Sequence, residues 1–362
     1  MRTHTLRVFA LALATALLSS ASPAQSPDKP WPIRAVIVTT FEVGNDTGDI
    51  PGEFQFWVER EHLTEILPFP GGPTIPGIPG ETHSIRTNAD HTILGIVSGT
   101  TLVNATASMM ALGLDPRFDL THAYILINGI AGVDPKIASL GSAAWADYVV
   151  NDVAREIDPR EAPKDWPYGI YPSGATRPDP DAVTETTWTR SNLYTLNPTL
   201  TAWAYAQTKD LNLGDDPKVA AFRTGFTNDP AAQRPPFVLI GATFSSDYYW
   251  HGTIMTQYAR DWVRLYTQGK GTFTTTEMED AGFMNAIERL GNMHRVDPNR
   301  VLILRTASNF SEERPGHAAA ESITAPYIGG RLALESAYLC GSTVLHKLLA
   351  DWPTTYSHIP GN

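Results

Sequence analysis

The stretch TEMEDAGFMNAIERLGNMHRVDPNRVLILRTASN, Thr276 to Asn309, decides the fold class. Its first part, TEMEDAGFMNAIERLG, is typical of a helix. Its last part, RVLILRTASN, is an apolar run typical of a buried strand. A helix that leads directly into a buried strand is the repeating unit of α/β domains. The rest of the chain shows the same alternation.

Short apolar runs that predict buried strands alternate with further helical patterns. In the segment TTLVNATASMMALGL, for example, Leu102, Ala105, Met109 and Leu112 fall on one helical face. The alternation predicts an α/β domain with helices on both faces of a central, mostly parallel or mixed sheet. The other predicted strands are 34–41, 92–99, 123–132, 142–152 and 236–244, and the other predicted helices are 197–210, 253–268 and 331–352.

The domain organisation follows from composition. We expect one domain over residues 30–352, interrupted by an insertion around 156–198 that is rich in proline, tryptophan and aspartate and has little periodicity. Ligands of such folds bind where strands end at their carboxyl edge. The four predicted strand ends lie near Glu42, Gly99, Gly129 and Asn309.

The first 24 residues form a separate segment. Arg2 and Arg7 precede the apolar run VFALALATALL, and small residues at Ser22 and Ala24 suit cleavage after Ala24. This pattern is typical of a secretory signal peptide and predicts a periplasmic or secreted protein. The alternative, a membrane anchor, needs a longer apolar run than this one. No later segment is apolar enough to span a bilayer, so we expect a soluble mature chain without stable membrane insertion.

The bulk properties exclude several classes of function. The chain has 362 residues and a net charge of −11 with no basic run, so nucleic acid is a poor candidate partner. The single cysteine, Cys340, cannot form an internal disulfide. Neither a nucleophile-elbow motif nor a phosphate loop is present, and no histidine or cysteine spacing suggests a metal site. No cofactor and no metal are therefore expected.

The acidic cluster at the start of the quoted stretch has two interpretations. Thr276 and Glu279 are three residues apart at a predicted helix start, which is the spacing of a capping box. Met278 would then be an ordinary core residue. Alternatively, the cluster binds a ligand at the sheet edge.

Four segments taken in order resemble the nucleoside phosphorylase and nucleosidase superfamily: VSGTTLVNATASMMAL, ILINGIAGVDPKIASLGSAAWADYVV, TEMEDAGFMNAI and VLILRTASN. With TTFEVGNDTGDIPGEFQFWVER, MALGLDPRFDLTHAYILINGIAGVDP and AQRPPFV, the chain is similar to the purine nucleoside permease family from about Arg34 to Leu349. The resemblance implies a three-layer α/β/α fold of the nucleoside phosphorylase type, with a central mixed sheet.

The resemblance also implies a purine nucleoside ligand (inosine, guanosine or adenosine) and a ribose site. By resemblance, Met278 packs on the sugar face and Glu279 accepts hydrogen bonds from the 2′ and 3′ hydroxyls. A carboxylate and a thioether suit these roles physically. The turn at Gly99 and Thr100 is expected to line the same ribose site.

The base site is expected at Asn309, which would meet the purine near N7 and its 6-substituent. Its amide has both a donor and an acceptor, which suits a 6-oxopurine, although Asn309 could equally start a turn. Phe244, Tyr249 and Trp250 are candidates for an aromatic wall, with core packing as the alternative for each of them. His251 beside them titrates near neutral pH and is a candidate acid.

The nucleophile is the point where the chain departs from the superfamily. Ile130 stands where phosphorylases have a phosphate-binding Ser, and its side chain cannot donate to phosphate. Water is thus the expected nucleophile, which makes the predicted activity that of a purine nucleosidase. Glu42 is the predicted base for this water, Asp46 is the second choice, and both could instead be solvated acids of a polar loop.

Two other functions stay open. The chain could be a non-catalytic exported protein that binds purine nucleosides and assists their uptake, which needs Glu279, Met278 and Asn309 but not Glu42. It could also be a storage or surface protein without chemistry. The resemblance leaves the insertion 156–198 unexplained. The insertion could cover the site, or it could form the interface of a homo-oligomer.

Overall fold

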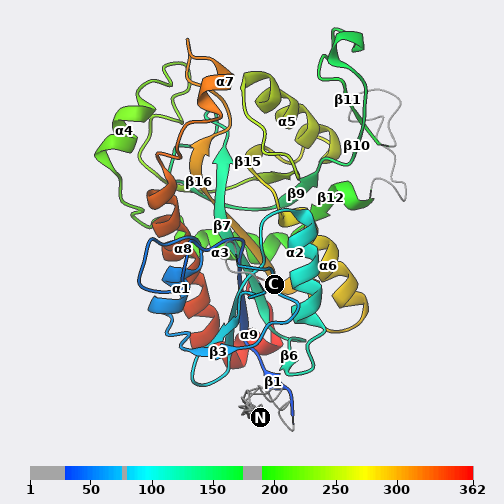
Figure 1. Cartoon of the computed structure of the whole chain (residues 1–362), viewed down its shortest axis with the longest axis vertical. Coiled ribbons are helices and arrows are strands. Elements are labelled where there is room, and N and C mark those ends of the chain that lie inside the picture. The colour runs from blue at the N-terminus through cyan, green and yellow to red at the C-terminus, as the bar shows by residue number, and fades with distance from the viewer. Residues whose placement is uncertain (1–28, 76–79, 174–189, 362) are drawn as a thin grey trace, which may run out of the picture.

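The computed structural model describes residues 29–75, 80–173 and 190–361 (Figure 1). The predicted signal peptide, 1–24, lies outside the described residues. Within them, twelve strands form one mixed sheet. They are β2 Ala35–Thr39, β3 Glu65–Leu67, β4 Ile85–Thr87, β5 Ile93–Val97, β7 Tyr124–Val133, β8 Ala143–Trp145, β9 Tyr148–Asn151, β12 Leu193–Thr195, β13 Val238–Ile240, β14 Ala242–Ser245, β15 Phe273–Glu277 and β16 Val301–Phe310.

The centre of the sheet is parallel and its flanks are partly antiparallel. β2 pairs in parallel with β5 and β7, and β7 pairs in parallel with β16. β15 runs antiparallel to β7, and β8 runs antiparallel to β16. Two small sheets lie outside this one: β1 Trp31–Pro32 pairs with β6 Phe118–Asp119, and β10 Ala154–Glu156 pairs with β11 Ile170–Pro172 within the insertion.

Helices cover both faces of the sheet because successive strand residues point to opposite sides. The helices are α1 Gln55–Arg60, α2 Leu102–Gly113, α3 Pro198–Thr208, α4 Pro217–Arg223, α5 Thr253–Tyr266, α6 Asp280–Asn292, α7 Ala319–Ser322, α8 Gly330–Ala350 and α9 Trp352–Ser357. Val36 and Val38 belong to one buried cluster, which α2 and α6 complete, whereas Ala35 and Ile37 belong to another, which α1, α3 and α8 complete (Figure 1). The predicted three-layer α/β/α architecture is confirmed.

Two predicted strands are each divided into two. The segment 142–152 forms β8 and β9, and the segment 236–244 forms β13 and β14. Gly241 marks the second break, because a Cβ there would collide with the side chain of Thr274. In both cases the chain changes its position in the sheet between the two strands. An unbroken apolar run in the sequence does not reveal such a break.

The predicted helix starts have different outcomes. For α3 the prediction is confirmed, since the Asn197 side chain accepts hydrogen bonds from the N–H groups of Thr199 and Leu200. The capping box at Thr276 and Glu279 is wrong. Thr276 lies within β15, and the Glu277 carboxylate accepts the N–H groups of Glu279 and Asp280 at 2.6 and 2.7 Å.

No helix in the part of the chain that the structure describes combines the length and the apolar composition needed to cross a bilayer.

Candidate functional site

The candidate site lies at the carboxyl edge of the sheet, where β7, β15 and β16 meet. Gly132 of β7 pairs with Thr276 of β15 and with Asn309 of β16, and β16 has an irregular register between Ala307 and Asn309. A Cβ on Gly132 would lie 3.0 Å from the Thr276 methyl and 3.4 Å from the Asn309 amide nitrogen. This close pairing places Asn309 at the same edge of the sheet as Met278 and Glu279, which directly follow β15.

Arg305 of β16 is the charged centre of this edge, and the sequence did not single it out. Its side chain is 1 % exposed and forms a bidentate ion pair with Asp280, with N–O distances of 3.0 and 2.6 Å. It also lies 3.3 Å from Glu279 and 3.5 Å from Glu277. The cluster thus joins the two ends of the stretch 276–309. Arg305 in its strand is the counter-ion for the acids at its start, Glu277, Glu279 and Asp280.

Glu53 is a fourth buried carboxylate at this cluster. A Cβ on Gly129 would lie 2.5 Å from Glu53 Oε1 and 2.7 Å from Arg305 Nη1, so both side chains pack on the bare Cα of Gly129. Glu53 Oε2 accepts the N–H and the hydroxyl of Thr40, both at 2.7 Å, and Oε1 accepts the N–H of Ile130 at 2.7 Å.

One guanidinium cannot balance four carboxylates in a buried site, and the pKa values of Glu53, Glu277 and Glu279 are raised accordingly. Burial raises the pKa of Glu279 to about 7, against the opposing charge of Arg305. Burial also raises the pKa of Glu53, again against Arg305. Burial and the neighbouring Asp280 raise the pKa of Glu277 well above its ordinary value. Acids that titrate near neutrality are a feature of functional sites.

The Glu279 carboxylate is held only by long hydrogen bonds. Its Oε1 accepts the N–H of Thr101 at 3.4 Å, and its Oε2 accepts the N–H of Met278 at 3.2 Å. Glu279 is 5 % exposed, while Met278 beside it is half-buried. The carboxylate therefore keeps capacity for shorter bonds from the hydroxyls of a ligand.

The turn that follows β5 carries Gly99 and Thr100, which the sequence analysis predicts at the ribose site, and the next residue, Thr101, donates its N–H to Glu279. Gly99 has a φ of +80° and Thr101 a φ of +84°, a conformation that a β-branched residue rarely adopts. Thr100 is exposed between them. An unpredicted residue, Asp247, accepts the N–H of Leu102 at 2.9 Å and so fixes the start of α2 at this turn.

The structure brings three of the predicted base-site residues together. Asn309, Tyr249 and His251 line one crevice of about 40 Å³, which holds little more than one water molecule. The Asn309 amide nitrogen lies 3.5 Å from the Tyr249 hydroxyl. Tyr327, which the sequence analysis missed, closes the crevice by stacking on Tyr249 at a centroid distance of 6.0 Å.

The other predicted aromatic residues lie in the core or against it. Phe244 has no exposed surface, and its ring is enclosed by Trp250, Tyr258 and Phe273. Trp250 is half-buried and packs against the same cluster. In this conformation neither ring is a wall of the Asn309 crevice, so core packing, the alternative weighed for each, describes their placement.

His251 has no hydrogen-bond partner for either ring nitrogen among the described residues. Burial lowers the pKa of His251, against the opposing charge of Glu313. The imidazole is thus mainly neutral at pH 7. It can donate one hydrogen bond to a ligand, but it is a weak source of protons at that pH.

Glu42 does not join the charged cluster. Its carboxylate accepts four backbone N–H groups, from Val43, Gly52, Phe54 and Gln55, and so caps the start of α1. A carboxylate has about four lone-pair positions, and all of them are used here. Asp46 is also engaged, because its carboxylate lies 2.7 Å from Arg86 and 3.9 Å from His83.

Of the described residues, no group of three or more His, Cys, Asp or Glu side chains has the arrangement of a metal site.

Comparison with known proteins gives consistent matches. The family model described as purine nucleoside permease (NUP) matches residues 32–360. A probable purine nucleoside permease of Schizosaccharomyces pombe is 32% identical over 286 residues, which cover 77% of this chain and 82% of that protein. A purine nucleoside permease of Candida albicans is 30% identical over 311 residues, covering 83% and 75%.

Among solved structures, a mutant of Helicobacter pylori MTAN with 5′-methylthioadenosine in its active site superposes with a TM-score of 0.50. The sequence identity is 14%, and the match covers 87% of this chain and 99% of that one. At this identity the likeness concerns the fold.

Proposed function

Because the chain belongs to the purine nucleoside permease family, we propose that it binds a purine nucleoside at the carboxyl edge of its sheet and cleaves the N-glycosidic bond with water. The observation that carries this proposal is the buried cluster of Glu53, Glu279 and Arg305. In this cluster Glu279, which is held by long hydrogen bonds, pairs with Arg305, and Glu53, which has an unfilled acceptor position, lies near the same guanidinium.

Glu279 binds the ribose in this proposal. The 2′ and 3′ hydroxyls replace its long contacts with Thr101 and Met278 by shorter, charge-assisted hydrogen bonds. Arg305 keeps the carboxylate partly ionised and correctly oriented. The half-buried Met278 packs on the sugar face, next to the turn at Gly99 and Thr100.

The purine binds at Asn309, and the crevice must open to admit it. A volume of about 40 Å³ is too small for a purine ring, so the stacked pair of Tyr249 and Tyr327 has to separate. The two rings then flank the base, and the Asn309 amide hydrogen-bonds its edge. Inosine and guanosine suit an amide that both donates and accepts.

Glu53 is a better candidate base than Glu42. Three of its four lone-pair positions accept hydrogen bonds from Thr40 and Ile130, which leaves one position for a water molecule. All four positions of Glu42 are filled by backbone N–H groups. Burial raises the pKa of both carboxyls, so the free lone-pair position is what distinguishes Glu53 from Glu42.

The reaction balances with these groups. The water oxygen bonds to C1′ while the C1′–N9 bond breaks, and Glu53 takes the proton from the water. The bonding electrons leave with the purine, which Asn309 stabilises by hydrogen bonds and which takes a proton from solvent. Glu279 and its neighbours place negative charge beside the oxocarbenium-like sugar. The same charge opposes the entry of phosphate, because Arg305 is already engaged by carboxylates.

The test compares purified protein and two variants with inosine, guanosine and adenosine, with and without phosphate, by chromatography of the free base. We expect release of base without phosphate. Glu53→Gln should lower the rate about 10²-fold or more, whereas Glu42→Gln, the matched control, should retain most of it. Release that requires phosphate contradicts hydrolysis, and an unchanged rate in Glu53→Gln contradicts the assigned base.

A non-catalytic binding protein is the second candidate. The observation in its favour is that Asn309 cannot donate a proton to the leaving purine, as a carboxylic acid could. Saturable binding of inosine without release of base, weakened by Glu279→Gln, would support this function. We also propose, for either function, that residues 1–24 direct export. N-terminal sequencing of the mature protein tests this proposal.

A further inference from the structure

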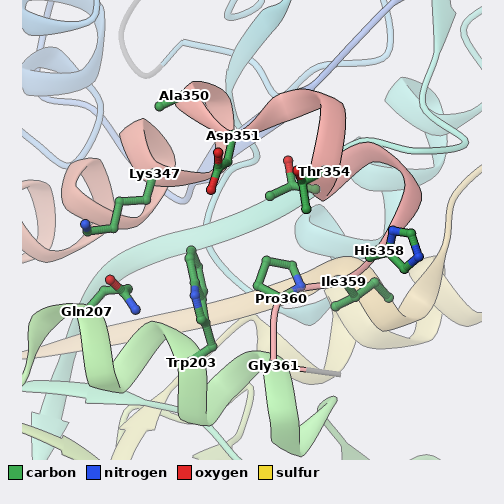
Figure 2. A pocket seen from close by; sticks show the side chains of 11 residues that line it. Trp203, Gln207, Lys347, Ala350, Asp351, Thr354, His358, Ile359, Pro360 and Gly361 are labelled. Carbon is green, nitrogen blue, oxygen red and sulfur yellow. The ribbon is translucent and has the colours of Figure 1, made fainter.

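A second pocket lies at the opposite end of the sheet from the candidate site. It has a volume of about 460 Å³ and is formed by α3, the end of α8, α9 and the C-terminal residues (Figure 2). Arg300, directly before β16, donates to the carbonyls of Thr355 and Tyr356 in α9, which places this region at the amino end of the strand. The ten residues of β16 separate the two sites.

The floor of the pocket is fixed to the hydrophobic core. Trp203 and Ile359 both pack against the buried cluster that α3 and α8 share. The C-terminal segment is held closely on the start of α3. Gly361 has a φ of +90°, and a Cβ there would lie 2.5 Å from the Thr199 carbonyl oxygen. Pro360 therefore has a defined place beside the Trp203 indole (Figure 2).

Two charged side chains and one amide around the pocket have no partner among the described residues. Lys347 and Asp351 lie one helical turn apart at the end of α8, and Gln207 faces them from α3 (Figure 2). Within residues 29–75, 80–173 and 190–361, none of the three side chains forms an ion pair or a hydrogen bond. Lys347 and Asp351 thus offer one positive and one negative charge without neutralising each other.

We propose that this pocket binds a free α-amino acid with an aromatic or large apolar side chain. The ligand carboxylate pairs with Lys347, its ammonium group pairs with Asp351, and its side chain lies on the Trp203 indole and Pro360. Two unpaired charges of opposite sign match a zwitterion, whereas a neutral nucleoside offers neither charge. The indole face supplies the apolar contact that such a side chain needs.

The experiment separates the two charges by using three probes: L-phenylalanine, its amide and its N-acetyl derivative. Phenylalaninamide lacks the carboxylate, and N-acetylphenylalanine lacks the ammonium group. Titration calorimetry of the full chain should show saturable binding of phenylalanine, with each derivative about tenfold weaker. Nucleoside turnover is not involved, so the result is independent of the proposed function.

Variants then assign each charge. In Lys347→Gln the difference between phenylalanine and its amide should disappear, and in Asp351→Asn the difference between phenylalanine and its N-acetyl derivative should disappear. Both side chains are exposed, so the fold should be retained. Lys218→Gln, an exposed residue of α4 away from the pocket, should bind all three probes as the unmodified protein does.

The proposal is overturned if phenylalanine shows no saturable binding up to about 10 mM, or if the derivatives bind as well as the free amino acid. It is also overturned if the variants leave these differences intact. Binding of inosine that Lys347→Gln weakens would identify a nucleoside as the occupant instead.

Discussion

Two arginines, one directly before β16 and one within it, are buried, and their side chains are used differently. Arg300, directly before the strand, is 4 % exposed, donates to two backbone carbonyls in α9, both at 2.7 Å, and lies 3.3 Å from Asp297. Arg305, in the middle of the strand, is 1 % exposed and faces Asp280, Glu279 and Glu277. The contacts of Arg300 join two segments of the fold. The contacts of Arg305 gather carboxylates of like charge around one cation, an arrangement that stabilisation of the fold alone does not require.

The largest expected effect distinguishes these two arginines. Arg305→Gln leaves several buried carboxylates without a counter-ion, and we expect a loss of about 3–5 kcal/mol in the free energy of unfolding at pH 8. Arg300→Gln leaves two carbonyls without donors and should lower the same free energy by about 1–3 kcal/mol. Denaturant unfolding measures both values.

The pH dependence of the two losses sharpens the comparison. At pH 5 Glu279 is largely protonated, because burial raises its pKa to about 7, and burial raises the pKa of the neighbouring Glu277 well above its ordinary value. The Arg305→Gln loss should therefore shrink at pH 5, while the Arg300→Gln loss should stay nearly constant. Losses that are equal and independent of pH would show that Arg305 has only a structural role.

Glu279 should make the stability of the protein fall as the pH rises. Its pKa in the folded protein is about 7, above the ordinary value of 4.5. For an acid with a raised pKa, the stabilising contribution is complete below the unfolded pKa and is lost as the pH rises to the folded pKa. Between pH 4.5 and 7 the loss should reach about 3 kcal/mol, and Glu279→Gln should remove it.

Nucleoside binding should have the opposite pH dependence. The ionised Glu279 accepts ribose hydroxyls more strongly than the protonated form, so affinity for inosine should rise through about pH 7. Calorimetry between pH 5.5 and 8.5 measures this trend. An affinity that does not change with pH, or that Glu279→Gln leaves intact, would remove Glu279 from the ribose site.

The sequence predicted features that depend on local or periodic patterns. The alternation of strands and helices, the cap at Asn197 and the meeting of the Gly99 turn with Glu279 follow from spacing, strand ends and the resemblance to a family. Arg305 was missed because its partners are 25 to 28 residues away and are joined to it only by the pairing of β15 and β16 with β7.

The two acids after β2 illustrate the same limit. Glu42 lies three residues after the end of the strand, whereas Glu53 returns to it only after the loop 43–52. Nothing local in the sequence indicates that the loop folds back. In the folded chain, N–H groups of the loop and of the residues after it fill the acceptor positions of Glu42, and Glu53 lies beside Arg305. The one local signal was the Gly52-Glu53 pair immediately before an amphipathic segment, which is where a helix begins and an acid is favoured.

The smallest expected effect tests the amino end of β16. Asn197 caps α3, and its amide also donates to the Asn299 carbonyl at 3.2 Å, one residue before Arg300. Asn197→Ala removes both contacts and should lower the free energy of unfolding by about 1 kcal/mol at every pH, since no charge is involved. Asn197→Asp should preserve the cap and recover most of that loss. Nucleoside binding should be unchanged in both variants, because their effect is confined to the amino end of the strand. A change in inosine affinity in either variant would mean that the two ends of β16 are coupled, and that the contrast between Arg300 and Arg305 is one of degree.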